Sequence, residues 1–273
     1  MSATTDHLGL AARAVPTWSA ASRAARLVER NVLSYRRMWP AFASGLFEPV
    51  FYLFSLGVGL GPLVGSLAGP GGRLLDYPAF VAPGLLAAAA MNGAMIDATF
   101  GLFFKLKYAK TYEAVLSTPL EIEDVALGEV VWSLLRGGIY SSLFVAVMAV
   151  QGIVESWWGL LLLPACLLIA AAFAAAGMAC ATFMRGWQDF DYVQLVLLPL
   201  FLFSSTFYPL STYPPALRAV VWCTPLFHGV QLCRQLSVGV VDATTLVHVA
   251  VLAALALLGI AVVKRRLRVL LIS

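Results

Sequence analysis

Long apolar runs alternate with short polar stretches along most of this chain. Each run approaches the ~20 residues that an α-helix needs to cross the hydrocarbon core of a lipid bilayer. We predict transmembrane helices at about 41–64, 79–104, 128–152, 157–184, 190–208 and 244–263. The pattern therefore indicates an all-α integral membrane protein with six transmembrane helices.

The residues before the first apolar run fall into two parts. Residues 1–17 are small and polar and have no long apolar core, which predicts a flexible cytosolic tail rather than a signal peptide or a span. Between Trp18 and Trp39 the less polar residues recur every three or four positions, and arginines occupy the other faces. A basic amphipathic helix with tryptophan at both ends is typical of the membrane interface, so 18–39 is predicted as an interfacial helix. An ordinary solvated helix is the alternative.

The stretch 105–127 is the one long polar interruption between the two apolar halves. Three lysines close the apolar run before it, as expected where a helix emerges at the anionic cytosolic surface. Thr118 and Pro119, followed by Glu121, form a capping box with proline at the first helical position, which begins a new helix. The preceding piece, 111–116, is short and amphipathic. We interpret it as a cytosolic coupling helix that contacts a partner protein.

A second irregular stretch, 209–240, lies between the fifth and sixth apolar runs. It contains several prolines together with Arg218, His228 and Arg234, and a full span would bury such residues at high cost. Two short helices that enter the outer leaflet and return can keep these polar groups near water or protein. We therefore predict a re-entrant helical hairpin, with Arg218 and Arg234 extending toward outer headgroups. A seventh span is the alternative.

Composition agrees with this architecture. Hydrophobic residues make up 61% of the 273 residues and charged residues only 12%, whereas a typical soluble domain has roughly 25% charged residues. One membrane domain, 18–273, fills the chain after the tail. All lysines and arginines except Arg73, Arg218 and Arg234 fall on the side of both termini, which predicts cytosolic termini in an inner or plasma membrane. Because the basic residues flank apolar runs, the net charge of +4 indicates membrane topology and not nucleic-acid binding.

No motif for catalysis or metal binding is recognisable in the sequence. The four cysteines form no CxxC pair, so a zinc or redox site is not predicted. The glycine-rich segment 69–73 lacks the Gly-Lys-Ser/Thr of a phosphate-binding loop, and the HExxH and nucleophile-elbow patterns are absent. We therefore expect no cofactor, metal or ATPase site in this chain, and transport rather than enzymatic turnover.

Two carboxylates, those of Glu48 and Asp97, lie within predicted spans. Carboxylates are costly to bury in a membrane, so they usually face a cavity, a partner or an interface. One hypothesis is a proton relay, and the other is a structural role such as hydrogen bonding to a neighbouring helix. The structural role is favoured because no string of Asp, Glu and His continues across the bilayer. An integral membrane enzyme would require these two carboxylates to converge.

Two motifs, together with the order of the predicted elements, resemble permeases of ABC type 2 transporters. The first is TYEAVLSTPL at 111–120, after the second span. The second is FSSTFYPL at 203–210, after the fifth span, and it is followed by Pro214, Pro225, Leu226 and His228. Both are most similar to the branch that contains nodulation lipo-oligosaccharide exporters and actinobacterial drug exporters. Ser205 stands where many relatives are expected to have glycine. The residue type therefore leaves the backbone conformation of this turn undecided.

The resemblance implies a half-transporter. Two copies of the chain, or this chain and a paralogous permease, would form the translocation path in the lipid bilayer, driven by two separate cytosolic ATPase subunits that bind ATP and magnesium. Closure of the ATPase pair would push on the coupling helix and shift the permease from an inward-open to an outward-open arrangement. The residues implied to contact the ATPase are Tyr112, Glu113, Leu116, Thr118 and Pro119.

The resemblance also implies an exporter whose substrate passes between facing first, second and fifth spans. Lipid-linked glycans, lipids and apolar drugs all fit an aromatic path with few charges. Import of the same substrate, and a passive channel or assembly protein, are the alternatives. The short fifth run places its end within the outer leaflet, near the exit. Candidate residues of the path or its gate are Glu48, Phe51, Phe54, Asp97, Phe201, Phe207, Tyr208, Pro209 and His228.

Overall fold

The computed structural model of the protein describes residues 28–33, 39–108 and 122–272. The long helices are α2 (Trp39–Gly59), α4 (Tyr77–Lys107), α6 (Ile122–Val150), α7 (Leu162–Ala181), α8 (Asp189–Leu202) and α11 (Ala243–Ile272). The short helices are α3 (Gly61–Val64), η2 (Pro70–Gly72), η3 (Trp157–Leu161), η4 (Leu210–Thr212), α9 (Pro215–Cys223) and α10 (Pro225–Val238), where η marks a 3-10 helix. The strands are β1 (Ser66–Ala68) and β2 (Leu74–Asp76).

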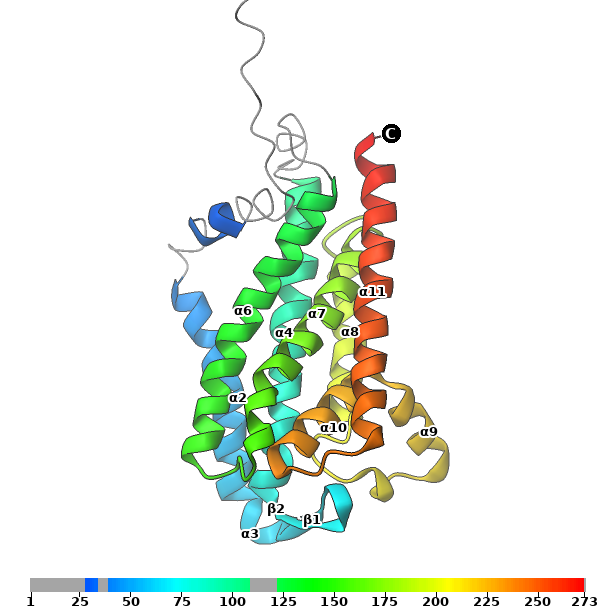
Figure 1. Ribbon diagram of the computed structural model, residues 1–273. Coiled ribbons are helices and arrows are strands. Elements are labelled where there is room, and N and C mark those ends of the chain that lie inside the picture. Colours follow the sequence, from blue (N-terminus) through cyan, green and yellow to red (C-terminus); the bar gives the residue numbers. More distant parts are fainter. Residues whose placement is uncertain (1–27, 34–38, 109–121, 273) are drawn as a thin grey trace, which may run out of the picture.

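Helix α4 lies at the centre of an elongated helical bundle (Figure 1). It contacts α7, α6, α10 and α2. Its alanine-rich stretch 85–90 is largely buried, because small side chains let neighbouring helices approach closely. The main apolar core is built from α4, α7, α10 and α11, and a second cluster joins α4, α7 and α11 to the beginning of α6. The fold is thus organised around one buried helix.

Four helical segments of the described chain are long and apolar enough to cross a membrane: Tyr77–Lys107, Ala126–Val150, Trp157–Ala181 and Ala243–Leu270. This finding confirms a helical membrane protein. The apolar helix Phe47–Gly59 within α2 and the 14-residue α8 are shorter, and 14 residues reach only ~21 Å across a hydrocarbon core of about 30 Å. Helices occupy all six predicted positions, and spanning by the first and fifth stays a prediction.

The stretch 209–240 folds into short pieces rather than one continuous helix. Helix α9 ends at Cys223 because Thr224 precedes a proline and has an extended backbone, with φ −77° and ψ 134°. Helix α10 then packs against α4, α11 and α7, whereas α9 lies at the edge of the bundle beside α10 and η4 (Figure 1). Two short helices are therefore present where the hairpin is predicted, and their placement in the bilayer stays a prediction.

The loop between α2 and α4 contains a small antiparallel hairpin of β1 and β2 that the sequence pattern does not predict. Gly71 and Gly72 adopt positive φ at its turn, 64° and 74°, where a side chain would be strained. Arg73 then donates to the carbonyl oxygen of Val238 at 3.1 Å and pairs with Glu155 at 3.0 Å. The glycine-rich segment therefore ties the loop to the end of α10 and to the connection between α6 and α7.

The N-terminal predictions fall mostly outside the described residues. The predicted tail, 1–17, lies outside them entirely. Of the predicted interfacial helix, 18–39, the structure describes a helix over 28–33 and the first residue of α2. The tail and the interfacial placement of this segment stay predictions.

Candidate functional site

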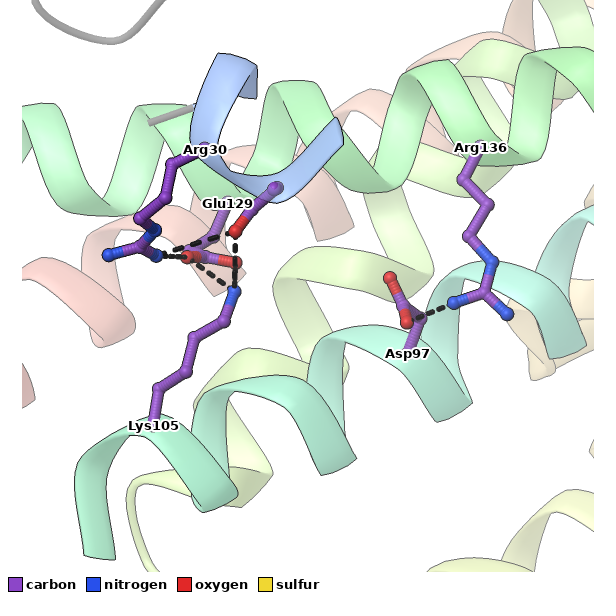
Figure 2. A network of polar contacts seen from close by, with 6 residues as sticks. Arg30, Asp97, Lys105, Glu129 and Arg136 are labelled. Carbon is purple, nitrogen blue, oxygen red and sulfur yellow. Dashed lines mark hydrogen bonds and ion pairs between the residues drawn. The ribbon is translucent and has the colours of Figure 1, made fainter. Parts of the chain in front are cut away.

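A group of polar side chains lies where α4 and α6 approach the predicted coupling region, and we call it the junction cluster: Arg30, Asn31, Lys105 and Glu129 (Figure 2). The Lys105 ammonium donates to both carboxylate oxygens of Glu129, at 2.7 and 2.6 Å, and to Asn31 Oδ1 at 3.2 Å. Arg30 Nη2 lies 3.7 Å from Glu129 Oε1. One buried carboxylate therefore connects the segment 28–33 to the end of α4 and the start of α6.

The junction cluster links the last turn of α4 to the beginning of α6. Lys105 lies in the last turn of α4 and Glu129 near the beginning of α6, so the two residues flank the stretch 109–121. Their side chains are 17% and 7% exposed, and solvent screens such a pair less than it screens a surface pair. The predicted ATPase contacts lie outside the described residues and stay predictions: Tyr112, Glu113, Leu116, Thr118 and Pro119.

A second ion pair joins the same two helices further inside the bundle. The Asp97 carboxylate of α4 accepts a hydrogen bond from Arg136 Nη1 of α6 (Figure 2). Both side chains are mostly buried, and the Arg136 guanidinium also lies near the ring of Tyr140. This pairing supports the structural role of Asp97. It also corrects the placement of Arg136, which lies in the interior of α6 and not among the cytosolic charges.

The candidate path residues on α2 are exposed in the part of the chain that the structure describes. The side chains of Phe51 and Phe54 are 66% and 52% exposed, and Glu48 is exposed with them. Asp97 pairs with Arg136, which favours a structural role over an enzyme that uses both carboxylates. Whether this face lines a path stays a prediction.

The candidate residues at the end of α8 and just after it form an aromatic group with neighbouring rings. The ring centroids of Phe201 and Phe207 lie 5.2 Å apart, and Phe201 also faces Tyr52 of α2 at 6.5 Å. The ring of Tyr208 packs on Tyr213 at 4.8 Å. Pro209 has an extended backbone and immediately precedes η4, the first short helix of the stretch 209–240. The structure thus brings α2 and the predicted exit motif into contact through aromatic side chains.

His228, a predicted gate residue, lies inside the bundle. Its Nδ1 atom lies 2.8 Å from Nδ1 of His248, and both side chains are buried. At that distance one ring donates a proton and the other accepts it, which joins α10 to α11. Sequence reasoning missed His248, because a single histidine in an apolar run has no spacing pattern that points to a partner.

The prediction that Arg234 reaches outer headgroups is wrong. Its side chain is 1% exposed, and the guanidinium carbon lies 3.8 Å from the centre of the Phe80 ring. Backbone carbonyl groups of neighbouring elements accept hydrogen bonds from its Nε and Nη2 atoms, which offsets part of the cost of burying the cation. Arg218 is exposed, and it donates to the carbonyl oxygen of Tyr213 at 2.7 Å. Nothing in the local sequence distinguishes these two arginines.

The backbone at Ser205 has the left-handed conformation, with φ 60°. This is the region that glycine adopts most readily, which fits the expectation that relatives have glycine here. The Ser205 hydroxyl donates to the carbonyl oxygen of Tyr208 at 2.9 Å. This local hydrogen bond therefore stabilises a turn that contains no glycine.

The model of the ABC-2 type transporter family matches residues 24–237. Nodulation protein J of Rhizobium leguminosarum bv. viciae is 31% identical over 226 residues, which cover 82% of this chain and 85% of the relative. Nodulation protein J of Bradyrhizobium diazoefficiens is 31% identical over 245 residues, which cover 87% of this chain and 91% of the relative. The family match includes the junction cluster, the predicted coupling region and all but the last residue of α10.

Proposed function

The chain belongs to the ABC-2 type transporter family, and on this basis we propose that it is the permease subunit of an ATP-driven exporter. The match covers the bundle from before α2 to the end of α10, and this observation carries the proposal. As a member of this family the chain is a transport subunit, and it is a multi-pass protein of the inner membrane. The coupling to ATP, the partners, the cytosolic termini and the substrate are parts of the proposal.

ATP hydrolysis on a separate cytosolic ATPase is proposed to act through the coupling region, 105–127. The junction cluster supports this idea because Lys105 and Glu129 connect both helices that flank the coupling region. A push on the stretch between them would reach α4 and α6 together and not one helix alone. The ATPase, and not this chain, would bind ATP and magnesium.

A second copy of the chain, or a paralogous permease, is proposed to cover the exposed face of α2 and α8. Leu197 is the one described residue of α8 that is buried within the chain. Glu48 is exposed on α2, and a carboxylate that faces lipid hydrocarbon is costly. A facing subunit or a water-filled path would accept Glu48 at a lower cost.

The substrate class proposed is a lipid-linked glycan, a lipid or an apolar drug. The candidate path is aromatic and has few charges, and its outer end carries the contacting rings of Tyr52, Phe201 and Phe207. The exit motif resembles those of nodulation lipo-oligosaccharide exporters and drug exporters. These features favour an amphiphilic or apolar substrate over an ion.

Affinity purification of the native protein from its own membrane tests the proposal. We expect a subunit with Walker motifs to co-purify. The double variant Glu113→Arg with Leu116→Asp should lose this subunit, because it reverses a charge and inserts a carboxylate at a desolvated contact, at a cost of more than about 2 kcal/mol. Leu74→Asp, in the exposed hairpin at the other end of the bundle, is the control and should retain it. Recovery of the protein without any ATPase would instead favour a passive channel or an assembly protein.

A further inference from the structure

Arg234 of α10 is a buried arginine whose hydrogen bonds go to backbone carbonyl groups. Its Nε donates to the carbonyl oxygen of Phe80 in α4 at 3.1 Å. Its Nη2 lies 2.9 Å from the carbonyl oxygen of Ser205 and 3.4 Å from that of Thr206. Among the described residues, no carboxylate forms an ion pair with it. The positive charge is therefore balanced by carbonyl dipoles and by the face of the Phe80 ring.

The carbonyl groups of Ser205 and Thr206 belong to what we call the outer turn, residues 203–210, which follows the end of α8. Ser204, Ser205 and Thr206 are fully buried, and a buried backbone carbonyl without a partner is costly. The turn supplies some of its own bonds: the hydroxyls of Ser204 and Thr206 lie 2.7 Å apart. The carbonyl groups of Ser205 and Thr206 depend on Arg234. Hydrogen bonds from a charged donor are among the strong ones in proteins.

Helix α4 contacts the outer turn closely at a glycine. A Cβ atom on Gly84 would lie 2.9 Å from Thr206 Cγ2 and 3.1 Å from Thr206 Cα. The turn therefore packs directly on the α4 backbone, while Arg234 bonds to its carbonyl groups. It has little freedom to shift unless α4 or α10 shifts with it.

Helix α10 is itself fixed by contacts at several points along its length. His228 bonds to His248 of α11, and the Gln235 side chain bonds to Thr244 at 2.7 Å and Thr245 at 2.9 Å. Arg73 donates to the carbonyl oxygen of Val238, the last residue of α10. By contrast, α9 buries only Val221. The two short helices of the hairpin are therefore not equivalent: one is fixed in the core and the other lies on the surface.

We propose that Arg234 is a positioning residue for the outer turn. It makes the turn, α4 and α10 one rigid unit, and it leaves α9 as the part of the hairpin that can move. The proposal rests on the proposed transport function only where it assigns the turn to the exit of the path.

Hydrogen–deuterium exchange of the purified full-length protein in lipid nanodiscs tests this inference. In Arg234→Gln we expect the amides of 203–210 to exchange roughly 10-fold or more faster, since the opening free energy of that segment falls. Arg234→Lys keeps the charge but loses the planar arrangement of donors, so its effect should be intermediate. The exchange rates of amides in α11 and in the C-terminal half of α4 should change by less than about 2-fold in both variants.

A second variant perturbs the same turn without touching the arginine. Gly84→Ala should also accelerate exchange in 203–210, because the new methyl group collides with Thr206. The matched control for Gly84→Ala is Gly101→Ala in the same helix, where a Cβ meets nothing within 4 Å. The control for Arg234→Gln is Arg218→Gln, which also removes an arginine from the hairpin. If the Arg234 variants do not fold, Gly84→Ala decides the question.

Two results would overturn the proposal. The first is unchanged exchange in 203–210 for the Arg234 variants that fold and for Gly84→Ala. The second is equal acceleration throughout the bundle, which would make Arg234 a general contributor to stability. The measurement uses neither ATPase nor substrate. A failure to find the ATPase would therefore refute the proposed function and leave this result standing.

Discussion

Single charged side chains decide how the helices of this protein are held together. The carboxylate of Glu129 binds Lys105 and lies near Arg30. The carboxylate of Asp97 binds Arg136. Each of these pairs joins α4 to α6, so changes to one residue should be felt in two helices.

Glu129→Gln should destabilise the protein by about 2 kcal/mol or more, because it leaves the largely buried Lys105 without its carboxylate. For a chain of this size the apparent unfolding temperature in detergent should fall by roughly 4–8 °C. The charge-exchanged variant, Lys105→Glu with Glu129→Lys, should recover part of this loss. The measurement is thermal unfolding followed by intrinsic fluorescence.

The control for Glu129 is a solvent-exposed pair in the same chain. Arg73 and Glu155 have side chains that are 52% and 40% exposed, and exposed pairs contribute at most about 1 kcal/mol. Glu155→Gln should therefore shift the unfolding temperature much less than Glu129→Gln. Equal shifts for the two variants would contradict the special role of the junction cluster.

Asp97 and Arg136 should be strongly coupled in a double-mutant cycle. Asp97→Asn and Arg136→Gln each leave a mostly buried charge without its ion-pair partner, and each should cost about 3–5 kcal/mol. The double variant should cost about 1–3 kcal/mol less than the sum, because neither charge remains. If Asp97 were part of a proton relay, the double variant would fold well and yet lose transport completely. Retained transport supports the structural role.

At this scale the sequence predicts the presence of unusual residues better than their contacts. Glu48 and Asp97 are recognisable because carboxylates are rare in apolar runs, and the expected glycine at Ser205 points to its positive φ. The partners of Arg234 are backbone carbonyl groups of Phe80 and Ser205, which no side-chain pattern marks. Tertiary contacts of this kind depend on the packing of helices that are distant in the sequence.

At the scale of elements, local signals are strong, and a helix is present at each of the six predicted apolar runs. Apolar runs place the helices, and Thr224-Pro225 divides the hairpin into α9 and α10. Burial does not follow from such signals. Helix α10 carries polar residues and yet lies in the core, because its arginine, histidine and glutamine find partners on α4 and α11. The small β-hairpin is missed because its three-residue strands are too short to show a periodic pattern.

Gly259→Ala should separate α11 from α7. A Cβ at Gly259 would lie 2.7 Å from Ala175 Cβ and 2.8 Å from its backbone carbonyl carbon, and overpacking of this kind typically costs about 1–3 kcal/mol. Gly101→Ala, in open space on α4, should instead be neutral or stabilising by up to about 1 kcal/mol, since alanine favours the helix. Denaturation of both variants in the same detergent checks this, and equal stability would contradict it.

At the scale of the whole molecule, the distribution of charge predicts the orientation in the membrane. The uneven distribution of lysine and arginine favours cytosolic termini. The basic residues still lie mainly on the side of the termini when Arg136 is counted within the bundle. The β-hairpin and α9 lie at the end of the bundle opposite to the C-terminus (Figure 1). They are therefore expected on the outer side.

Single cysteines at positions 70 and 115 should differ in labelling by an impermeant thiol reagent on intact cells. The background replaces the four native cysteines with alanine. We expect labelling at position 70, which lies in η2 on the outer loop, and none at position 115 in the coupling region. Permeabilised cells are the control and should label position 115. Labelling of position 115 in intact cells would reverse the orientation and leave the ATPase no place to bind.

The ion pair between Asp97 and Arg136 also bears on how the chain enters the membrane during synthesis. Helix α4 leaves the ribosome before α6, and a lone carboxylate near the middle of a helix raises the insertion free energy by about 2.5–3.5 kcal/mol. The α4 and α6 segments are also the two least hydropathic of the four span candidates. We infer that the translocon retains α4 until α6 arrives, and that the two helices pass into lipid together with their charges already neutralised.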